Sequence, residues 1–262
     1  MTALFRRWLR RGDGTPVVLI HGLAADHHSW RSFVAANPLG HPVLALDLPG
    51  HGASAPLAAP SLPAMAAAVR AMLDEEGIRE AHIVGHSLGG GVAALAADAL
   101  GAGTRSLLLI APAGLGVDVD ARLVAALARA RDEVTLAPLL AQFVADPALI
   151  TPAFVRLTAA QRADGRLCAQ QVAIVAATFP PEGGAVPQAN VEAVRGAIAR
   201  QQAPVRVVIG AEDRIVPPRQ MEGLPGTVAR HILPGVGHLP HMEARLPLGR
   251  ILRETMRSGA PA

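Results

Sequence analysis

A serine at position 87 lies in the pentapeptide Gly85-His86-Ser87-Leu88-Gly89, which fits the pattern G-x-S-x-G. The mostly apolar residues 81–84 before it indicate a short buried strand, and residues 90–97 after it favour a helix. A serine on such a strand-to-helix turn exposes its hydroxyl, and flanking glycines let neighbouring backbone approach closely. The N-terminus of the helix also directs backbone N–H groups at negative charge that forms beside the serine. We therefore predict that Ser87 is a nucleophile.

A nucleophilic serine needs a general base and an acid that orients this base, and in chains with this pattern both follow the serine. Asp213 is the predicted acid, because it follows the apolar segment 205–209. His238 is the predicted base, just beyond a second strand-like segment at 229–233. Both residues would then lie at the carboxyl ends of strands, which is the edge of an open α/β sheet where sites gather.

Three other residues compete for these two roles. Glu212 precedes Asp213 by one position and is expected to point elsewhere. His231 lies within a predicted strand and His241 opens a predicted helix, so structural roles are favoured for both histidines. The sequence therefore favours Asp213 as the acid and His238 as the base.

An acyl-transfer site also needs two backbone N–H groups that hold the oxyanion, and a tight turn after an early strand supplies one of them. The apolar segment 17–20 leads into His21-Gly22-Leu23-Ala24, which fits this position. We predict that the N–H groups of Leu23 and Leu88 are the two donors. Loss of such a donor costs on the order of 3 kcal/mol of transition-state stabilisation.

Five motifs occur in the order found in the α/β-hydrolase superfamily, which the chain resembles over nearly its whole length. The resemblance implies an α/β-hydrolase fold, with a mostly parallel sheet flanked by helices, and structural roles for Asp47 and His51. Segments 110–116, 145–151 and 233–243 further resemble the hydrolase-like domain of the dihydrolipoamide acetyltransferase component of acetoin dehydrogenase systems. The five motifs are His21-Gly22, Asp47-Leu48-Pro49-Gly50-His51-Gly52-Ala53-Ser54, Gly85-His86-Ser87-Leu88-Gly89, Gly210-Ala211-Glu212-Asp213 and Gly237-His238.

Alternating strand and helix patterns predict the parallel sheet independently of the motifs. A helix is predicted over 62–76 and another directly after Ser87. Segment 5–9 can supply one strand before the others, where the superfamily usually has two, so we expect one edge strand to be missing. The remaining predicted strands are 17–20, 43–46, 81–84, 107–110, 205–209 and 229–233.

The alternation stops between about residues 115 and 202, where segments rich in Ala, Leu and Arg are interrupted by prolines. We interpret 115–202 as a helical cap between two parts of the core, 1–114 and 203–262. Such a cap would cover the serine and enclose an apolar pocket. Arg156, Arg162 and Arg166 within it are expected on a solvated face.

Composition limits the classes of protein. The 262 residues contain no lysine, which excludes a lipoyl-lysine, a pyridoxal-phosphate Schiff base and a P-loop lysine within them. A net charge of only +3 with scattered arginines gives little support to nucleic-acid binding. The uncharged stretch 81–97 is explained by the strand, turn and helix, so no membrane partner is expected. A single cysteine, Cys168, and the lack of a secretory pattern after Arg6 and Arg7 favour a cytoplasmic protein.

Three residues near the first glycine turn could suggest a metal site. His27 and His28 form an adjacent pair, but neighbours in sequence rarely face one site, so we expect surface histidines. Asp26 is expected to cap the following helix. His86 beside the nucleophile is expected to pack sideways. We therefore predict that the protein needs neither metal nor cofactor.

These features predict a serine hydrolase that acts on a small or medium acyl ester or thioester through an acyl-enzyme. Acyl transfer, carbon–carbon bond hydrolysis and a non-catalytic scaffold stay open as alternatives. The carbon–carbon bond hydrolases of ring-cleavage products typically have Asn before the serine and Trp after the histidine, where this chain has His86 and Leu239. Haloalkane dehalogenases and epoxide hydrolases use aspartate as the nucleophile, so Ser87 speaks against both.

Overall fold

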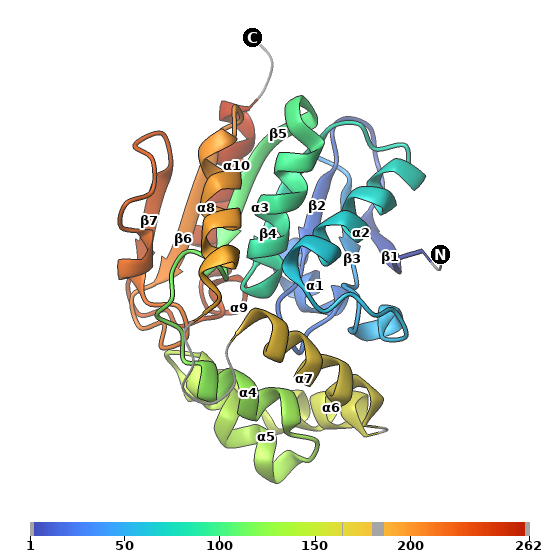
Figure 1. Ribbon diagram of the computed structural model, residues 1–262, viewed down its shortest axis with the longest axis vertical. Coiled ribbons are helices and arrows are strands. Elements are labelled where there is room, and N and C mark those ends of the chain that lie inside the picture. Colours follow the sequence, from blue (N-terminus) through green and yellow to red (C-terminus); the bar gives the residue numbers. More distant parts are fainter. Residues whose placement is uncertain (1–2, 164, 180–185, 260–262) are drawn as a thin grey trace.

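A seven-stranded sheet forms the centre of the computed structural model, which describes residues 3–163, 165–179 and 186–259 (Figure 1). The strand order is β1-β3-β2-β4-β5-β6-β7. β1 runs antiparallel to β3, and every other neighbouring pair is parallel, as predicted. The strands are β1 (Arg6–Arg10), β2 (Val17–Ile20), β3 (Val43–Leu46), β4 (Ala81–His86), β5 (Thr104–Ile110), β6 (Val205–Gly210) and β7 (Ala229–Leu233).

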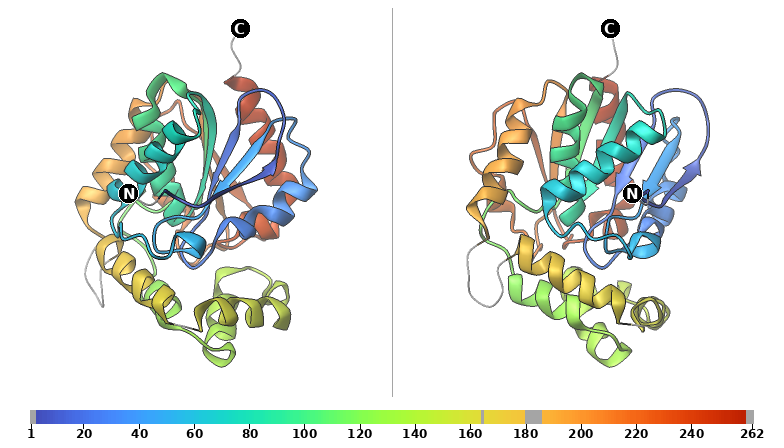
Figure 2. Two further views of the ribbon diagram at one scale, coloured as in Figure 1. Left: turned by 90° about the vertical axis from the view of Figure 1, so that its right-hand side faces the viewer. Right: turned by 45° about the vertical axis from the view of Figure 1, so that its right-hand side comes forward.

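Helices cover both faces of the sheet because the strands are apolar on both sides (Figure 2). On β2, Val18 and Ile20 face the core beneath α2, α3 and α8, whereas Val17 and Leu19 face the core beneath α1 and α10. The helices are α1 (Arg31–Ala36), α2 (Leu62–Glu75), α3 (Leu88–Leu100), α4 (Ala121–Arg129), α5 (Glu133–Leu140), α6 (Pro152–Arg162), α7 (Arg166–Thr178), α8 (Gln188–Arg200), α9 (Pro240–Glu243) and α10 (Arg245–Ser258). No helix among the described residues is both long and apolar enough to cross a membrane.

Four helices between β5 and β6, α4 to α7, form a separate layer across one end of the sheet (Figures 1 and 2). We call these four the cap helices. Three of them start at a side chain that caps the helix: Asp120 accepts from the Leu123 N–H, Asp132 from Thr135, and Thr151 from Phe154. The predicted cap, 115–202, also includes α8, which packs on α3 beside the sheet (Figure 1). The layer over the strand ends is thus shorter than the predicted segment.

A buried arginine joins the cap helices, and the prediction of a solvated face at this position was wrong. Arg162, at the end of α6, is only 1% exposed. Its guanidinium donates to the carbonyl oxygens of Ala130 at 2.6 Å, Leu127 at 2.8 Å and Ala128 at 2.9 Å, and to Gln171 Oε1 at 2.7 Å. These carbonyls belong to the C-terminal end of α4, whose dipole favours a cation. The periodicity of α6 alone does not reveal an acceptor on another helix.

Candidate active site

Ser87, His238 and Asp213 come together where β4, β7 and β6 end. Ser87 Oγ lies 2.9 Å from His238 Nε2, and His238 Nδ1 lies 2.9 Å from Asp213 Oδ2. An ionised carboxylate can only accept, so Nδ1 carries the hydrogen and Nε2 offers a lone pair to the serine hydroxyl. The three residues that the sequence singled out are therefore in contact, in the order that proton abstraction from Ser87 requires.

The backbone of Ser87 is in a rarely populated conformation, with φ 52° and ψ −120°. Such a conformation costs of order 1–3 kcal/mol and needs support from its surroundings. The Ser87 N–H donates to the Ile110 carbonyl at 2.9 Å, and its carbonyl accepts from Gly90 at 2.8 Å and Ala113 at 2.9 Å. A Cβ at Gly85 would overlap the Gly89 carbonyl oxygen, so this tight turn needs glycine. The turn thus fixes the hydroxyl at the strand end.

Asp213 is held by the backbone that follows it. Its Oδ1 accepts from the N–H groups of Ile215 at 2.8 Å and Val216 at 2.9 Å, which leaves Oδ2 for His238. Glu212 is exposed, and its Oε2 instead accepts from the Val236 N–H at 2.8 Å. The neighbouring glutamate therefore supports the loop and does not contact the imidazole.

The two competing histidines lie elsewhere in the structure. His231 is half-buried on β7, with its Nε2 3.2 Å from a guanidinium nitrogen of Arg206. His241 is buried on α9, and its ring centre lies 4.9 Å from that of Trp30 and 4.6 Å from that of His86. Neither histidine is hydrogen-bonded to Ser87.

The two predicted oxyanion donors lie in segments that adjoin the serine. Leu88 is the first residue of α3, so its N–H has no acceptor inside the helix. Leu23 follows Gly22, at which a Cβ would lie 3.1 Å from the Ser87 Cβ, so this loop touches the turn. Within the described residues, neither N–H donates to a protein acceptor. Their part in catalysis stays a prediction.

Glu243 on α9 is a site residue that the sequence reasoning missed. Its Oε2 accepts from the N–H of Gly237 at 2.9 Å and of Ala145 at 2.7 Å, and its Oε1 accepts from Leu239 at 3.0 Å. Gly237 and Leu239 flank His238, so one carboxylate fixes both sides of its loop. Its place in the first turn of a short helix could have predicted this role, since acidic residues there pair with free N–H groups.

The segment between the cap helices α5 and α6 also contacts His238. The His238 N–H donates to the Phe143 carbonyl oxygen at 2.7 Å. The Phe143 ring packs edge-on against the imidazole, with the ring centres 5.7 Å apart. The segment between α5 and α6 therefore anchors the layer of cap helices directly at His238.

A cavity of about 350 Å³ opens at Ser87 between the sheet and the cap helices. One end is apolar and buried, and the other end carries exposed polar side chains, so an acyl chain fits the first and a polar group fits the second. The buried wall consists of Val124, Leu127, Leu140, Phe143, Phe179, Ile215 and Val216. The exposed rim carries His28, Arg31, Ser32 and Gln161.

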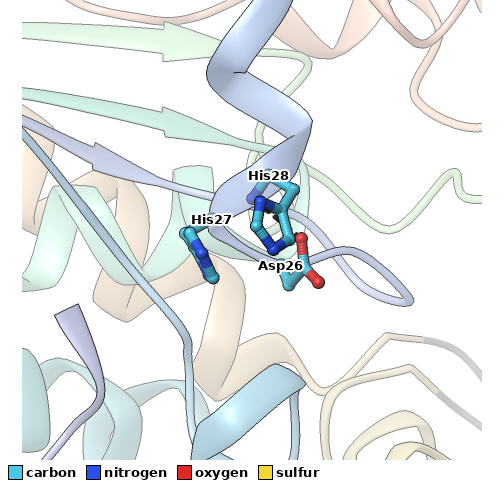
Figure 3. A group of neighbouring side chains, drawn as sticks. All are labelled: Asp26, His27 and His28. Carbon is cyan, nitrogen blue, oxygen red and sulfur yellow. Dashed lines mark hydrogen bonds between the residues drawn. The ribbon is translucent and has the colours of Figure 1, made fainter. Parts of the chain in front are cut away.

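Asp26, His27 and His28 follow the predicted oxyanion loop and each offer one metal-ligand atom, with these atoms within 4.8 Å of one another (Figure 3). Several of their polar atoms have protein partners, whereas His27 Nε2 is buried without a hydrogen-bond partner. His27 is 5% exposed, so the expectation of a surface histidine was wrong at this position. His27 contacts Asp47 Oδ1 through both its backbone N–H and its Nδ1, each at 2.8 Å. Asp26 Oδ1 accepts from the His28 N–H at 2.8 Å, so the predicted capping role is confirmed. Asp47 also accepts from Ala53 at 2.8 Å, which fits its expected structural role.

Comparison with known proteins agrees with the fold. Residues 15–245 match the family model described as alpha/beta hydrolase fold. Over 243 residues, the chain is 34% identical to the dihydrolipoyllysine-residue acetyltransferase component of the acetoin cleaving system from Pseudomonas putida. This match covers 91% of the chain but only 63% of that relative.

Two solved structures share the architecture at lower sequence identity. A meta-cleavage product hydrolase from Pseudomonas fluorescens superposes with a TM-score of 0.82 at 23% identity, over 98% of this chain and 96% of the other. A thermophilic esterase from Thermogutta terrifontis gives a TM-score of 0.75 at 21% identity, over 98% of this chain and 95% of the other. The family match and the shared architecture agree: the chain belongs to the α/β-hydrolase fold family.

Proposed function

We propose that this protein is a serine hydrolase that cleaves a small or medium acyl ester or thioester. His238 accepts the Ser87 proton while Oγ attacks the carbonyl carbon, and the Leu23 and Leu88 N–H groups hold the oxyanion. The leaving group takes the proton from His238 as the tetrahedral intermediate collapses to an acyl-enzyme. Water then gives a proton to His238 and attacks the acyl carbon. As this second intermediate collapses, His238 returns the proton to Ser87 Oγ and the acid is released.

One observation carries this proposal: the hydrogen-bonded chain from Ser87 through His238 to Asp213, with both links at 2.9 Å, faces a cavity large enough for a substrate. A non-catalytic scaffold would not need a serine in a strained backbone conformation at that cavity. A nucleophilic role for Ser87 therefore accounts for the strain as well as for the hydrogen bonds.

Labelling with a fluorophosphonate probe tests the nucleophile directly. We expect the protein to be labelled, and Ser87→Ala to abolish both labelling and ester hydrolysis without a change in thermal unfolding. Ser32→Ala is a matched control, because Ser32 also lines the cavity but lies at the exposed rim. Retention of most activity in Ser87→Ala would overturn the mechanism.

The substrate class follows from the buried apolar wall of the cavity. We expect kcat/KM for p-nitrophenyl esters of two to sixteen carbons to peak at short or medium chains, because overpacking opposes chains longer than the cavity. EDTA should leave these rates unchanged, since the proposed steps use neither metal nor cofactor. Steady growth to long chains, or loss of activity with EDTA, contradicts this proposal.

Transfer of the acyl group to a thiol is a second candidate, which the name of the Pseudomonas putida relative favours. The 262 residues contain no lysine, so a lipoyl arm would have to come from outside these residues. Adding dihydrolipoamide to the hydrolysis assay separates the two. A transferase would form acyl-dihydrolipoamide at the expense of free acid, whereas a hydrolase would form free acid at an unchanged rate.

A further inference from the structure

The histidine before Ser87 is buried and contacts the loop of His238, and it has no part in the mechanism described so far. His86 is the last residue of β4 and is 5% exposed. Its Nε2 lies 2.8 Å from the main-chain carbonyl oxygen of His238. A carbonyl oxygen can only accept, so Nε2 carries the hydrogen and donates it, and Nδ1 carries the lone pair. The tautomer of His86 is thus set by the backbone of the catalytic base.

The other ring nitrogen of His86 and the adjacent Cε1 lie against the predicted oxyanion loop. A Cβ at Gly22 would lie 2.7 Å from His86 Nδ1 and 3.1 Å from its Cε1, so the ring leaves no room for a side chain there. Gly22 directly precedes Leu23, one of the predicted oxyanion donors. The imidazole of His86 therefore lies between the oxyanion loop and the loop of the base.

Other rings restrict the movement of His86. Its ring centre lies 4.6 Å from that of His241 and 5.1 Å from that of His238, and His241 in turn packs on Trp30 at 4.9 Å. Burial lowers the pKa of His86 well below its usual value, and His241 and His238 lower it further. A neutral ring suits this position, because a positive charge beside His238 would oppose the imidazolium that forms during catalysis.

We propose that His86 is a positioning residue for the general base. Its Nε2–H holds the His238 carbonyl, and so keeps the imidazole of His238 in line with Ser87 Oγ while the proton moves. This inference rests on the proposed hydrolase function. A base displaced by about 1 Å can lower the rate about 100-fold, so loss of this donor is expected to lower kcat by about 10- to 100-fold. KM should change far less, since binding in the apolar cavity does not use this hydrogen bond.

Three substitutions at position 86 separate a hydrogen bond from simple packing. Gln can place its amide N–H near the position of the imidazole Nε2, whereas the shorter Asn reaches only the position of Nδ1. Phe keeps the ring and removes the donor. We expect His86→Gln to keep most of kcat, and both His86→Asn and His86→Phe to lose it.

His82 offers a matched control on the same strand. It is also buried, at 4% exposed, but its Nδ1 is 2.8 Å from Ser106 Oγ at the far end of β4. His82→Phe should lower the thermal unfolding temperature about as much as His86→Phe and leave kcat unchanged. Unfolding curves of all variants identify any that fail to fold, and kcat is then compared among the folded ones.

The outcomes of this experiment distinguish the inference from the proposed function. Full kcat in folded His86→Phe, or equal loss in His86→Gln and His86→Phe, would overturn the positioning role while the hydrolase function stands. Absence of fluorophosphonate labelling and ester hydrolysis in the unsubstituted protein would instead overturn the proposed function. Recovery in Gln but not in Asn, with KM little changed, supports the inference.

Discussion

The strand ends of the sheet and the cap helices build opposite sides of one cavity in different ways. At the strand ends, Ser87, Asp213 and His238 are each held by backbone hydrogen bonds, so reactive atoms are fixed before substrate arrives. The cap helices present mainly apolar side chains, and such a surface sets size and shape without directing a bond. We therefore expect substitutions at the strand ends to change kcat, and those in the cap helices to change substrate preference and stability.

The two regions meet at His238, the proposed general base. Phe143 accepts from the His238 N–H, and the Ala145 N–H donates to Glu243, whose carboxylate also holds the loop of His238. The segment before α6 is therefore coupled to the base, and only substitutions farther from it should separate selectivity from turnover.

The largest expected effect is at the strand ends. Asp213→Asn should lower kcat by about 10⁴-fold, as the same change does in a serine protease triad, because the amide can favour the wrong tautomer of the histidine. Steady-state kinetics on a short ester measures the loss. Glu212→Gln is the matched control, since Glu212 holds the Val236 N–H and does not contact His238. If Glu212→Gln were the more damaging change, the acid would be the other carboxylate.

A second prediction concerns the buried histidines, none of which lies between residues 87 and 230. Burial lowers the pKa of His51 and of His241 to about 3 and that of His82 to about 4. In the unfolded chain these histidines titrate near pH 6.5, so below that pH the unfolded state binds more protons than the folded state. Acid therefore favours unfolding. The free energy of unfolding should fall by several kcal/mol from pH 7 to pH 4, at up to about 1.4 kcal/mol per pH unit for each histidine.

Urea unfolding at several pH values measures this slope. His82→Phe should reduce the pH dependence of the free energy of unfolding by the contribution of one histidine, because Phe cannot take up a proton in the unfolded chain. A stability that stays constant from pH 7 to pH 4 would contradict the neutral state of these buried rings. Activity assays at low pH should be read together with these curves, so that unfolding is separated from protonation of the base.

Local patterns were enough to predict the parts of the site that depend on short segments. The turn at Ser87 and the strand ends at Asp213 and His238 follow from apolar runs with glycine or acidic residues after them. Glu243 was not identified, and His86 was expected only to pack sideways, because their hydrogen-bond partners are backbone groups brought near by the fold. Arg162 was misplaced for the same reason, since its acceptors lie on α4, about 30 residues away. Local periodicity shows which face of an element is apolar, but not which distant carbonyl lies opposite it.

Arg162 also provides the third prediction, which concerns the cap helices. Arg162→Met should lower the free energy of unfolding by about 3 kcal/mol, because it leaves buried carbonyl acceptors without a donor. Turnover of a short ester should change less than about threefold in the folded fraction. Arg156→Met, at an exposed position on the same helix, should be nearly neutral. A large loss of kcat without loss of stability in Arg162→Met would show that the cap helices take part in the chemistry.

The smallest expected effect is a change in chain-length preference. Phe179 is 4% exposed and forms part of the buried wall of the cavity. Phe179→Ala should extend the apolar end, and each further methylene that becomes buried can gain up to about 0.8 kcal/mol, or about fourfold in kcat/KM. The p-nitrophenyl ester series should then peak at a longer chain, while kcat for the acetyl ester stays within about twofold.

Leu157→Ala is the matched control for this last test, because Leu157 also lines the cavity but is 61% exposed at its open end. Its truncation should leave the preferred chain length unchanged. An unaltered optimum in Phe179→Ala would mean that the acyl chain does not enter the buried end. A shift in both variants would instead place the acyl chain along the rim. The strand ends would then still determine kcat, but the buried wall of the cavity would not determine the preferred chain length.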